Sequence, residues 1–278
     1  MQNVEMEKDI KKILVFDVFG DYAHFRRINT TTSPLTYPIP PRTALCGLIG
    51  AILGLSKDEN EYLSHFTRDK AKIGLRVLSP IKKVTIAENL IHTKNAKGIG
   101  MNLITDRSPT NFEFLKDPKY RIYFWHEDKT LYGQLKNNLL KHKSVYTPCF
   151  GLSENIANFE YVGEFDVLPK DEHGEFLQIH SVIPMERVSE NGINFSIKKE
   201  YLPVNNLPVE MNQERISKLP MLYHRVNLPV EMNQERIVTK RSRILLEENG
   251  NPIEAKIIEH CWEITRGSRE RENVFFIE

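Results

Sequence analysis

The sequence has few cysteines and no long hydrophobic run. Its 278 residues include three cysteines, Cys46, Cys149 and Cys261, which are far apart and form no C-x-x-C pair. This spacing argues against a disulfide framework and is typical of a reduced compartment. The longest apolar segment, Ala44 to Leu55, is shorter than the ~20 residues of a membrane-spanning helix. Since the first residues also lack the basic end and apolar core of a signal peptide, we expect a cytoplasmic protein without membrane contact.

Recognisable catalytic and cofactor motifs are absent as well. The sequence contains neither the phosphate-binding pattern G-x-x-x-x-G-K-S/T nor the nucleophile pattern G-x-S-x-G. Its nine histidines are dispersed, and none lies four residues from another, so no zinc-site spacing is present. We therefore expect no metal and no cofactor.

The net charge of +1 hides an uneven distribution along the chain. Residues 1–150 carry 23 Lys and Arg against 15 Asp and Glu, a net charge of +8, while residues 151–278 carry 15 against 22, a net charge of −7. This asymmetry predicts that a polyanion meets the N-terminal half and that the C-terminal half faces protein or solvent. The alternative is an ordinary fluctuation of mixed surface charge.

The most informative segment runs from Ile13 to Leu55. Alternating apolar residues predict a strand over Ile13–Phe19. The strand ends at Gly20 and is followed by DYAHFRR, residues 21–27, in which aromatic and basic side chains interleave. A polar, proline-broken loop then leads to a glycine-containing apolar helix, predicted over Ala44–Leu55. A basic and aromatic turn at a strand end is suited to holding phosphates and unstacked bases.

This segment resembles the N-terminus of the CRISPR-associated Cas-five (Cas5) family, a branch of the RAMP superfamily. The residues that carry the resemblance are Phe16, Gly20, Phe25, Arg26, the Pro40-Pro41-Arg42 turn and the helix Gly47–Leu55. Two shorter segments resemble the same family: Arg107–Thr110 with Phe114–Pro118, and Tyr146–Pro148 with Gly151–Glu154. The resemblance is closest to the type I-B form and extends, with gaps, through about the first 170 residues.

The predicted elements follow the order β-α-β-insert-β-α-β. The predicted strands are Ile13–Phe19, Ile73–Val77, Tyr120–Phe124 and Val162–Val167, and the helices are Ala44–Leu55, Asp58–Phe66 and Leu131–Leu140. This is the order of ferredoxin-like RNA-recognition folds. We therefore predict an α+β protein, with a ferredoxin-like domain of the RNA-recognition-motif type at residues 1–169 and a smaller β-rich region at residues 170–278.

The segment between the two middle strands, residues 81–118, is too long for a plain turn. It contains several lysines, among them Lys82, Lys83, Lys94 and Lys97. The resemblance implies that this insert is a protruding β-hairpin, the thumb, which wedges between nucleotides of the guide RNA. Lysines that follow phosphates and an apolar tip that unstacks bases fit that role. The alternative is a solvated loop whose lysines only keep it soluble.

The resemblance implies a non-catalytic subunit of a type I-B Cascade-like antiviral surveillance complex. Such a subunit holds the 5′ handle of the CRISPR RNA and caps one end of a backbone of Cas-seven type subunits. A large subunit of the Cas-eight type would contact the C-terminal part, and target DNA would be met indirectly, through base pairing of the guide. The residues expected to bind the handle are Tyr22, His24, Phe25, Arg26, Arg27 and Arg42, and those of the thumb are Lys82, Lys83, Lys94 and Lys97.

A different function, a metal-independent endoribonuclease that processes precursor CRISPR RNA, stays open. Type I-C relatives in the family have this activity, which needs a base for the 2′-hydroxyl proton and a cation for the phosphate. The candidates are His24 and His142, the latter between Lys141 and Lys143. His24 also suits base stacking, and Lys-His-Lys at a helix end also suits the terminal carbonyls and the helix dipole. Since a separate endonuclease cuts the RNA in type I-B systems, we expect binding without cleavage.

The C-terminal region contains an exact duplication. NLPVEMNQERI occurs at residues 206–216 and again at residues 227–237, whereas solenoid repeats diverge and need about three copies. One copy is therefore predicted to be surplus, in a connection between strands. A hairpin is predicted from Arg243–Glu248 and Ile253–Glu259 around Asn249-Gly250. The basic cluster at 240–243 is either an RNA contact or a solvated strand start.

Overall fold

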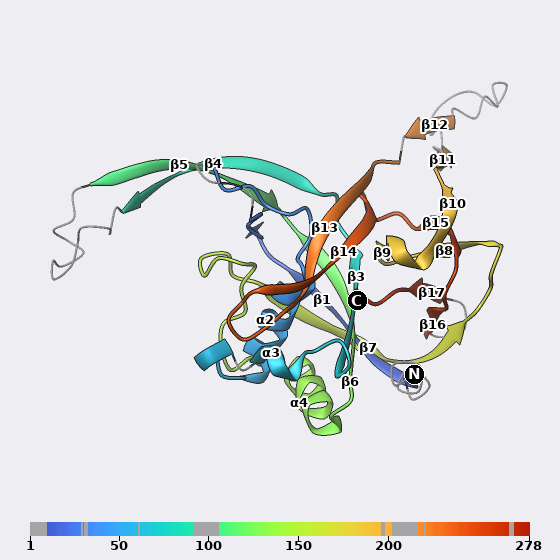
Figure 1. Cartoon of the computed structure of the whole chain (residues 1–278), viewed down its shortest axis with the longest axis horizontal. Helices are drawn as coiled ribbons and strands as arrows, with labels where there is room; N and C mark the ends of the chain where they lie inside the picture. Colours follow the sequence, from blue (N-terminus) through green and yellow to red (C-terminus); the bar gives the residue numbers. More distant parts are fainter. Residues whose placement is uncertain are drawn as a thin grey trace, which may run out of the picture.

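The computed structural model describes residues 10–28, 30, 33–60, 62–91, 106–195, 198–201, 216–219, 221–266 and 270–278. Its main feature is a nine-stranded sheet with the strand order β10-β15-β8-β17-β16-β7-β1-β6-β3. Helices cover one face of the N-terminal part of this sheet, and a long two-stranded arm projects from it (Figure 1). None of the helices in the described ranges has the length and apolar character needed to cross a membrane.

The N-terminal part contains the elements that the hydrophobic periodicity predicts. They are β1 (Lys12–Phe19), α2 (Arg42–Leu53), β3 (Ala71–Val77), β6 (Lys119–His126), α4 (Lys129–Leu140) and β7 (Asn158–Lys170). The four strands are adjacent in the order β7-β1-β6-β3, and every neighbouring pair is antiparallel. The predicted helical segment Asp58–Phe66 consists of a 3₁₀ turn, Asp58–Asn60, and a short helix, α3 (Tyr62–His65).

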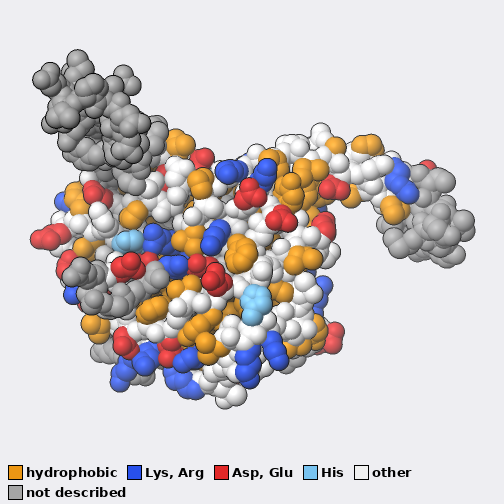
Figure 2. All heavy atoms as spheres, turned by 180° about the vertical axis from the view of Figure 1, so that it is seen from behind, with side chains coloured by type: hydrophobic (Ala, Val, Ile, Leu, Met, Phe, Trp, Pro, Cys, Tyr) orange, Lys and Arg blue, Asp and Glu red, His pale blue; other side chains and the backbone are white. Residues whose placement is uncertain are grey.

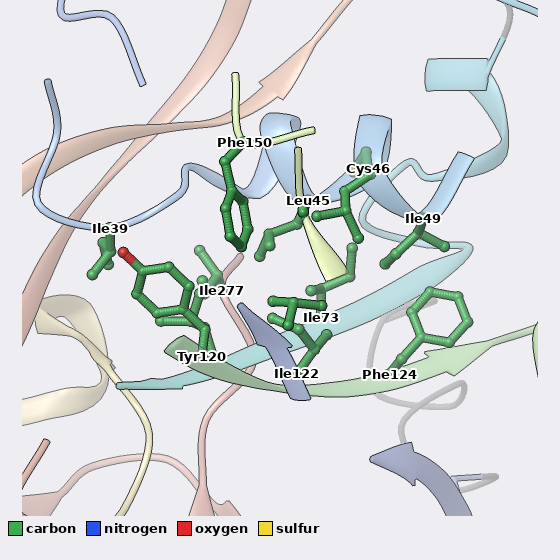
Figure 3. Packing of buried hydrophobic residues seen from close by; sticks show 14 of the residues in the cluster. Ile39, Leu45, Cys46, Ile49, Ile73, Tyr120, Ile122, Phe124, Phe150 and Ile277 are labelled. Atoms are coloured by element: carbon green, nitrogen blue, oxygen red, sulfur yellow. The ribbon is translucent and has the colours of Figure 1, made fainter. Parts of the chain in front are cut away.

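The hydrophobic core lies between this sheet and the two longer helices. Leu14, Phe16 and Val18 alternate along β1 and are fully buried on the helix side of the sheet. In Figure 3, Leu45 and Ile49 of α2 point from the helix toward the sheet. α2 ends at Gly54, whose φ of 80° is left-handed. At the start of α4, the Asp128 carboxylate accepts hydrogen bonds from the first backbone N–H groups.

The long insert forms the predicted antiparallel hairpin. β4 (Lys82–Ile91) pairs with β5 (Arg107–Lys116), from Lys82 opposite Lys116 at the base to Ile91 opposite Arg107 near the tip. The hairpin extends away from the rest of the molecule (Figure 1). A short strand, β2 (Tyr22–Ala23), pairs with the base of β5. The predicted RNA contacts at Lys94 and Lys97 lie outside the described residues.

The C-terminal part is rich in strands. The remaining elements are β8 (Phe176–Ile179), β9 (Ile183–Pro184), the 3₁₀ turn Met185–Arg187, β10 (Val188–Asn194), β11 (Lys198–Tyr201), β12 (Ile216–Leu219), β13 (Tyr223–Met232), β14 (Val238–Glu247), β15 (Ile253–Ile257), β16 (Cys261–Arg266) and β17 (Glu270–Val274). β16 pairs with β7, so several of these strands extend the N-terminal sheet. β13, β14 and β9 form a separate sheet, and β13 contacts α2.

The predicted hairpin around Asn249-Gly250 is wrong. β14 pairs with β13 and β9, whereas β15 pairs with β8 and β10. The turn itself is present: Gly250 has a φ of 76°, and a Cβ there would lie 2.2 Å from the carbonyl oxygen of Val77. The buried Glu247 carboxylate accepts the backbone N–H groups of Asn249 and Asn251 at 2.9 and 2.8 Å. Local chemistry therefore fixes the turn, while tertiary packing selects the partner strands.

The two copies of the duplicated sequence differ in their position. The second copy supplies most of β13, where Leu228 and Val230 are fully buried in the same core as α2. Residues 206–215 of the first copy lie outside the described residues, and Ile216 begins β12. The second copy is thus part of the folded core.

Candidate nucleic-acid interface

The turn that follows β1 is built against the base of the hairpin. Gly20 is required there, because a Cβ would lie 2.8 Å from the carbonyl oxygen of Ile156. Tyr22 then pairs with Lys116 across β2 and β5. The backbone N–H of Asp117 donates to the carbonyl of Asp21 at 2.8 Å. The aromatic and basic turn and the hairpin therefore meet at one place.

Glu113 of β5 joins the polar loop to the hairpin. Its Oε1 accepts hydrogen bonds from the backbone N–H of Thr36 at 3.1 Å and from Nζ of Lys83 at 2.8 Å. Its own N–H donates to the carbonyl of Pro34 at 3.0 Å, and its carbonyl oxygen lies 2.8 Å from Nδ1 of His24. Glu113 therefore holds both the polar loop and His24 of the turn against the hairpin.

Several of the predicted handle-binding residues are accessible at this junction. Tyr22 is 37% exposed, and its ring meets the edge of Phe114. Arg26 is exposed, and the guanidinium of Arg27 lies over the ring of Tyr37, 5.6 Å from its centre. Lys82 and Lys83, two of the four lysines predicted for the thumb, are exposed at the hairpin base.

Arg42 is buried, which contradicts its predicted contact with RNA. The side chain is 1% exposed and lies in the first turn of α2, pointing into the protein. Its guanidinium donates to the carbonyl oxygens of Phe66 at 2.8 Å, Ala71 at 2.7 Å and Val230 at 3.3 Å. Arg42 therefore holds the segment after α3, the start of β3 and β13 together, which is a structural role.

Phe25 and His24 are also buried, so their predicted RNA contacts do not agree with the structure. Phe25 is 5% exposed and packs edge-on against Phe150. His24 is 2% exposed and packs against the rings of Phe112 and Phe114, which stack on each other. Ala23, His24 and Phe25 are buried in succession after the exposed Tyr22, because the chain leaves the short β2 and enters the core beside the hairpin.

Burial also determines the protonation of His24. Desolvation lowers the pKa of its imidazole, and the positive charge of Arg26 acts in the same direction, while the hydrogen bond to the Glu113 carbonyl opposes the shift. Nδ1 is bonded to that carbonyl, and Nε2 is buried without a partner among the described residues. The ring is therefore a neutral, enclosed group rather than an accessible base.

His142, the other candidate base, lies in a different environment. It is exposed after the end of α4, with a φ of 49°, and its ring lies 4.8 Å from the ring of Phe159. The backbone N–H groups of Lys141 and Lys143 close the helix end by donating to the carbonyls of Asn137 and Asn138 at 3.1 and 2.9 Å. The two lysine side chains are exposed.

No metal centre is evident in the described part of the chain. Its His, Cys, Asp and Glu side chains form no group of three or more that could hold an ion. The three cysteines are free, and burial raises the pKa of the Cys261 thiol to about 12.

Three arginines of β13 and β14 form a group, of which the sequence indicated only the two in the basic cluster 240–243 as a possible RNA contact. Arg225, Arg241 and Arg243 are exposed on the face of this ribbon that points away from the core. Arg241 reaches the turn, because its guanidinium donates to the Tyr37 hydroxyl at 3.3 Å. In the sequence, Arg241 and Arg243 lie two residues apart in the 240–243 cluster, which indicates that they share one face of a strand. The sequence does not show that this strand lies beside Tyr37. Figure 2 shows that Lys and Arg side chains occur in several separate groups on the face it presents.

Comparison with known proteins assigns the chain to a family. The family described as CRISPR-associated protein (Cas_Cas5) matches residues 13–217. The chain belongs to the CRISPR-associated Cas5 family. The match includes the turn, the hairpin and the first part of the C-terminal region, so it extends beyond the first 170 residues that carry the resemblance in sequence. No curated protein matches the chain.

Three solved structures illustrate what this Cas5 chain is similar to. A CRISPR protein from Archaeoglobus fulgidus is 14% identical over 96% of this chain and 100% of that chain, with a TM-score of 0.47. A chain of a CRISPR RNA-guided surveillance complex is 13% identical over 86% and 91%, with a TM-score of 0.43. A chain of the Type III-B Cmr-beta complex bound to cognate target RNA is 13% identical over 86% and 86%, with a TM-score of 0.42. The family assignment rests on the sequence match, since these scores are low.

Proposed function

We propose that this Cas5 protein is a non-catalytic RNA-binding subunit of a type I-B Cascade-like surveillance complex. It holds the 5′ handle of the CRISPR RNA and caps one end of the backbone. The observation that carries the proposal is the junction at Glu113, where the aromatic and basic turn, the polar loop and the base of the projecting hairpin are joined by hydrogen bonds. One surface thus combines exposed cations with a long arm.

The N-terminal part is proposed to be a ferredoxin-like RNA-recognition domain. The antiparallel order β7-β1-β6-β3, with α2 and α4 packed on one face, supports this assignment. The hairpin β4–β5 would be the thumb, with Lys82 and Lys83 following phosphates at its base.

The handle would be held by the accessible members of the predicted set. Arg26 and Arg27 supply cations for phosphates, and Tyr22 supplies an exposed ring for a base. His24, Phe25 and Arg42 would support this surface from beneath it. The partners are the 5′ handle, backbone subunits of the Cas-seven type and a large subunit of the Cas-eight type, and target DNA is met only through the guide.

A second candidate function, a metal-independent endoribonuclease, is favoured by one observation. His142 is exposed between two exposed lysines, so a base and cations for a phosphate are available together. The enclosed His24 is a poorer candidate for the catalytic base, because neither of its ring nitrogens is accessible.

An RNA assay with the purified chain separates these functions. The chain is incubated with end-labelled repeat RNA, without metal and with Mg²⁺, and both binding and cleavage are measured. The proposal expects a shifted, intact RNA under both conditions. Site-specific cleavage at the handle boundary that His142→Ala abolishes, and that Lys129→Ala at the opposite end of α4 leaves unchanged, would make the enzyme the correct function.

A further inference from the structure

The outer face of the β13–β14 ribbon continues the cationic surface of the turn. Cross-strand pairing places Asn227 opposite Arg243 and Pro229 opposite Arg241. Directly opposed residues share a face, and Leu228 and Ile244, which alternate with them, are buried in the core. Arg241 and Arg243 therefore project on the solvent side, and Arg225, which is also exposed, lies on the same face opposite the buried Leu245. We call these three residues the ribbon arginines.

The ribbon arginines meet the turn at Tyr37. This tyrosine accepts a hydrogen bond from Arg241 at 3.3 Å, and its ring carries the guanidinium of Arg27 at 5.6 Å from the centre. The backbone N–H of Tyr37 donates to the carbonyl of Phe25 at 2.8 Å, which ties this tyrosine to the turn. Two positive groups from opposite halves of the chain are therefore held on one side chain.

These cations differ from several other arginines in how they are paired. Elsewhere in the described ranges, Arg68, Arg76, Arg121, Arg187 and Arg271 each lie within ion-pair distance of a carboxylate. Within the same ranges, Arg27 and the three ribbon arginines form no ion pair with a carboxylate. One carboxylate, Glu186, lies near Arg243 and accepts its backbone N–H at 3.5 Å. Since the other charges gathered here are alike and repel each other, an anion with several negative groups would stabilise this arrangement.

We propose that the ribbon arginines are a second phosphate-binding track, which continues the path of a single-stranded RNA from Arg27 along β14. The inference rests on the proposed RNA-binding function and extends it to the acidic C-terminal half. RNA fits better than an acidic protein segment because the polar residue Asn227 lies between the arginines, directly opposite Arg243. Arginine forks are also suited to phosphate geometry.

Fluorescence anisotropy with a labelled single-stranded repeat RNA, titrated at several salt concentrations, tests this track. The Arg225→Ala, Arg243→Ala double variant should bind more weakly and lose about 1.4 from the slope of log affinity against log salt, at about 0.7 for each phosphate contact. Replacement of both residues by lysine should restore the slope, because the charge is kept. Unchanged affinity and slope in the alanine variant would overturn the proposal.

Arg236→Ala is the matched control. Arg236 is an exposed arginine of the same ribbon, but it lies at the β13–β14 turn, near Tyr62 instead of Tyr37. It should leave the affinity and the slope at wild-type values. Thermal unfolding of all variants confirms that the ribbon is intact.

Two further results separate this track from the function on which it rests. If the wild-type chain does not bind RNA, the proposed function itself fails. If the wild type binds and only the Arg26→Ala, Arg27→Ala variant is impaired, the function holds and the track is wrong. Binding of poly-glutamate through the same arginines, with RNA binding unaffected by their loss, would assign the face to an acidic protein and overturn the RNA track.

Discussion

Nδ1 of His24 lies 2.8 Å from the backbone carbonyl oxygen of Glu113. This contact joins the turn after β1 to the projecting hairpin, 89 residues later in the chain. Because the His24 ring is enclosed by Phe112 and Phe114, it fixes the junction from inside. The accessible arginines are therefore presented by a supported turn and not by a free loop.

The junction should weaken as the pH falls. Burial lowers the pKa of folded His24 below 6.5, so the unfolded chain takes up a proton that the folded chain excludes. Its contribution to stability is complete above pH 6.5 and is lost as the pH decreases toward the folded pKa. Burial also lowers the pKa values of His126 and His180. The slope of the free energy of unfolding against pH in the wild type therefore reflects all three histidines. In urea unfolding, His24→Asn should remove up to about 1.4 kcal/mol per pH unit of that slope, and an unchanged slope would contradict the assignment.

The turn should supply phosphate contacts. Each of Arg26 and Arg27 that meets a phosphate contributes about 0.7 to the salt slope of single-strand binding, so Arg26→Ala, Arg27→Ala should lower the slope by up to about 1.4. Tyr22→Ala should cost ~1–3 kcal/mol through loss of base stacking, with the slope unchanged. Anisotropy with repeat RNA measures both, and Arg271→Ala, a paired arginine of β17, is the control. Wild-type values for the double variant would show that the turn does not bind RNA.

The hairpin should be separable from the fold. Glu88 lies opposite Thr110 in the β4–β5 register, so residues 89–109 can be replaced by an Asn-Gly turn that keeps the base and the Glu113 contacts. We expect unchanged thermal unfolding, because the core lies between the sheet and the helices, but weaker RNA retention. Loss of folding would mean that the arm is part of the core, and full RNA binding would remove its role as a thumb.

Arg42 should stabilise the fold without contacting RNA. Arg42→Met leaves the carbonyls of Phe66, Ala71 and Val230 without their charged donor. Because hydrogen bonds to charged groups contribute ~1.5–3 kcal/mol each, we expect a loss of about 3 kcal/mol or more in the free energy of unfolding. At a temperature low enough for Arg42→Met to remain folded, the variant should bind RNA with the wild-type salt slope. A reduced slope with normal stability would restore Arg42 to the RNA-binding set.

The duplicated sequence allows a test with identical neighbours. Leu228 of the second copy is fully buried, so Leu228→Ala should cost ~2–5 kcal/mol. Since the sequence predicts that one copy is surplus, the same substitution in the first copy, Leu207→Ala, should change the free energy of unfolding by less than about 0.5 kcal/mol. Equal losses in urea unfolding would show that both copies are structural.

The sequence predicted the elements that depend on local patterns. Alternating apolar residues place β1 and β6, and the helical spacing of Leu131, Leu135 and Leu139 places α4. The length of the insert left a separate element or a solvated loop open, the family resemblance implied a hairpin, and the structure confirms the hairpin. These signals are local, because a strand or helix needs one apolar face whatever it packs against.

Burial of polar and aromatic residues was decided by the tertiary structure. Arg42 and Arg26 are equally basic in the sequence, but Arg42 is buried and donates to carbonyl groups of three separate segments, whereas Arg26 is exposed. In the same way, the Asn249-Gly250 turn was predictable, while the partners of β14 and β15 depend on strands far away in the chain.

The sequence by itself determined a family, an α+β pattern and a basic, aromatic turn before a long insert. Only the tertiary structure brings Arg241 to Tyr37, across 204 residues of chain. The charge asymmetry between the two halves pointed away from this contact, because net charge sums over a sequence while a phosphate responds to the charges within a few ångströms. Which cations form one surface is therefore a property of the fold.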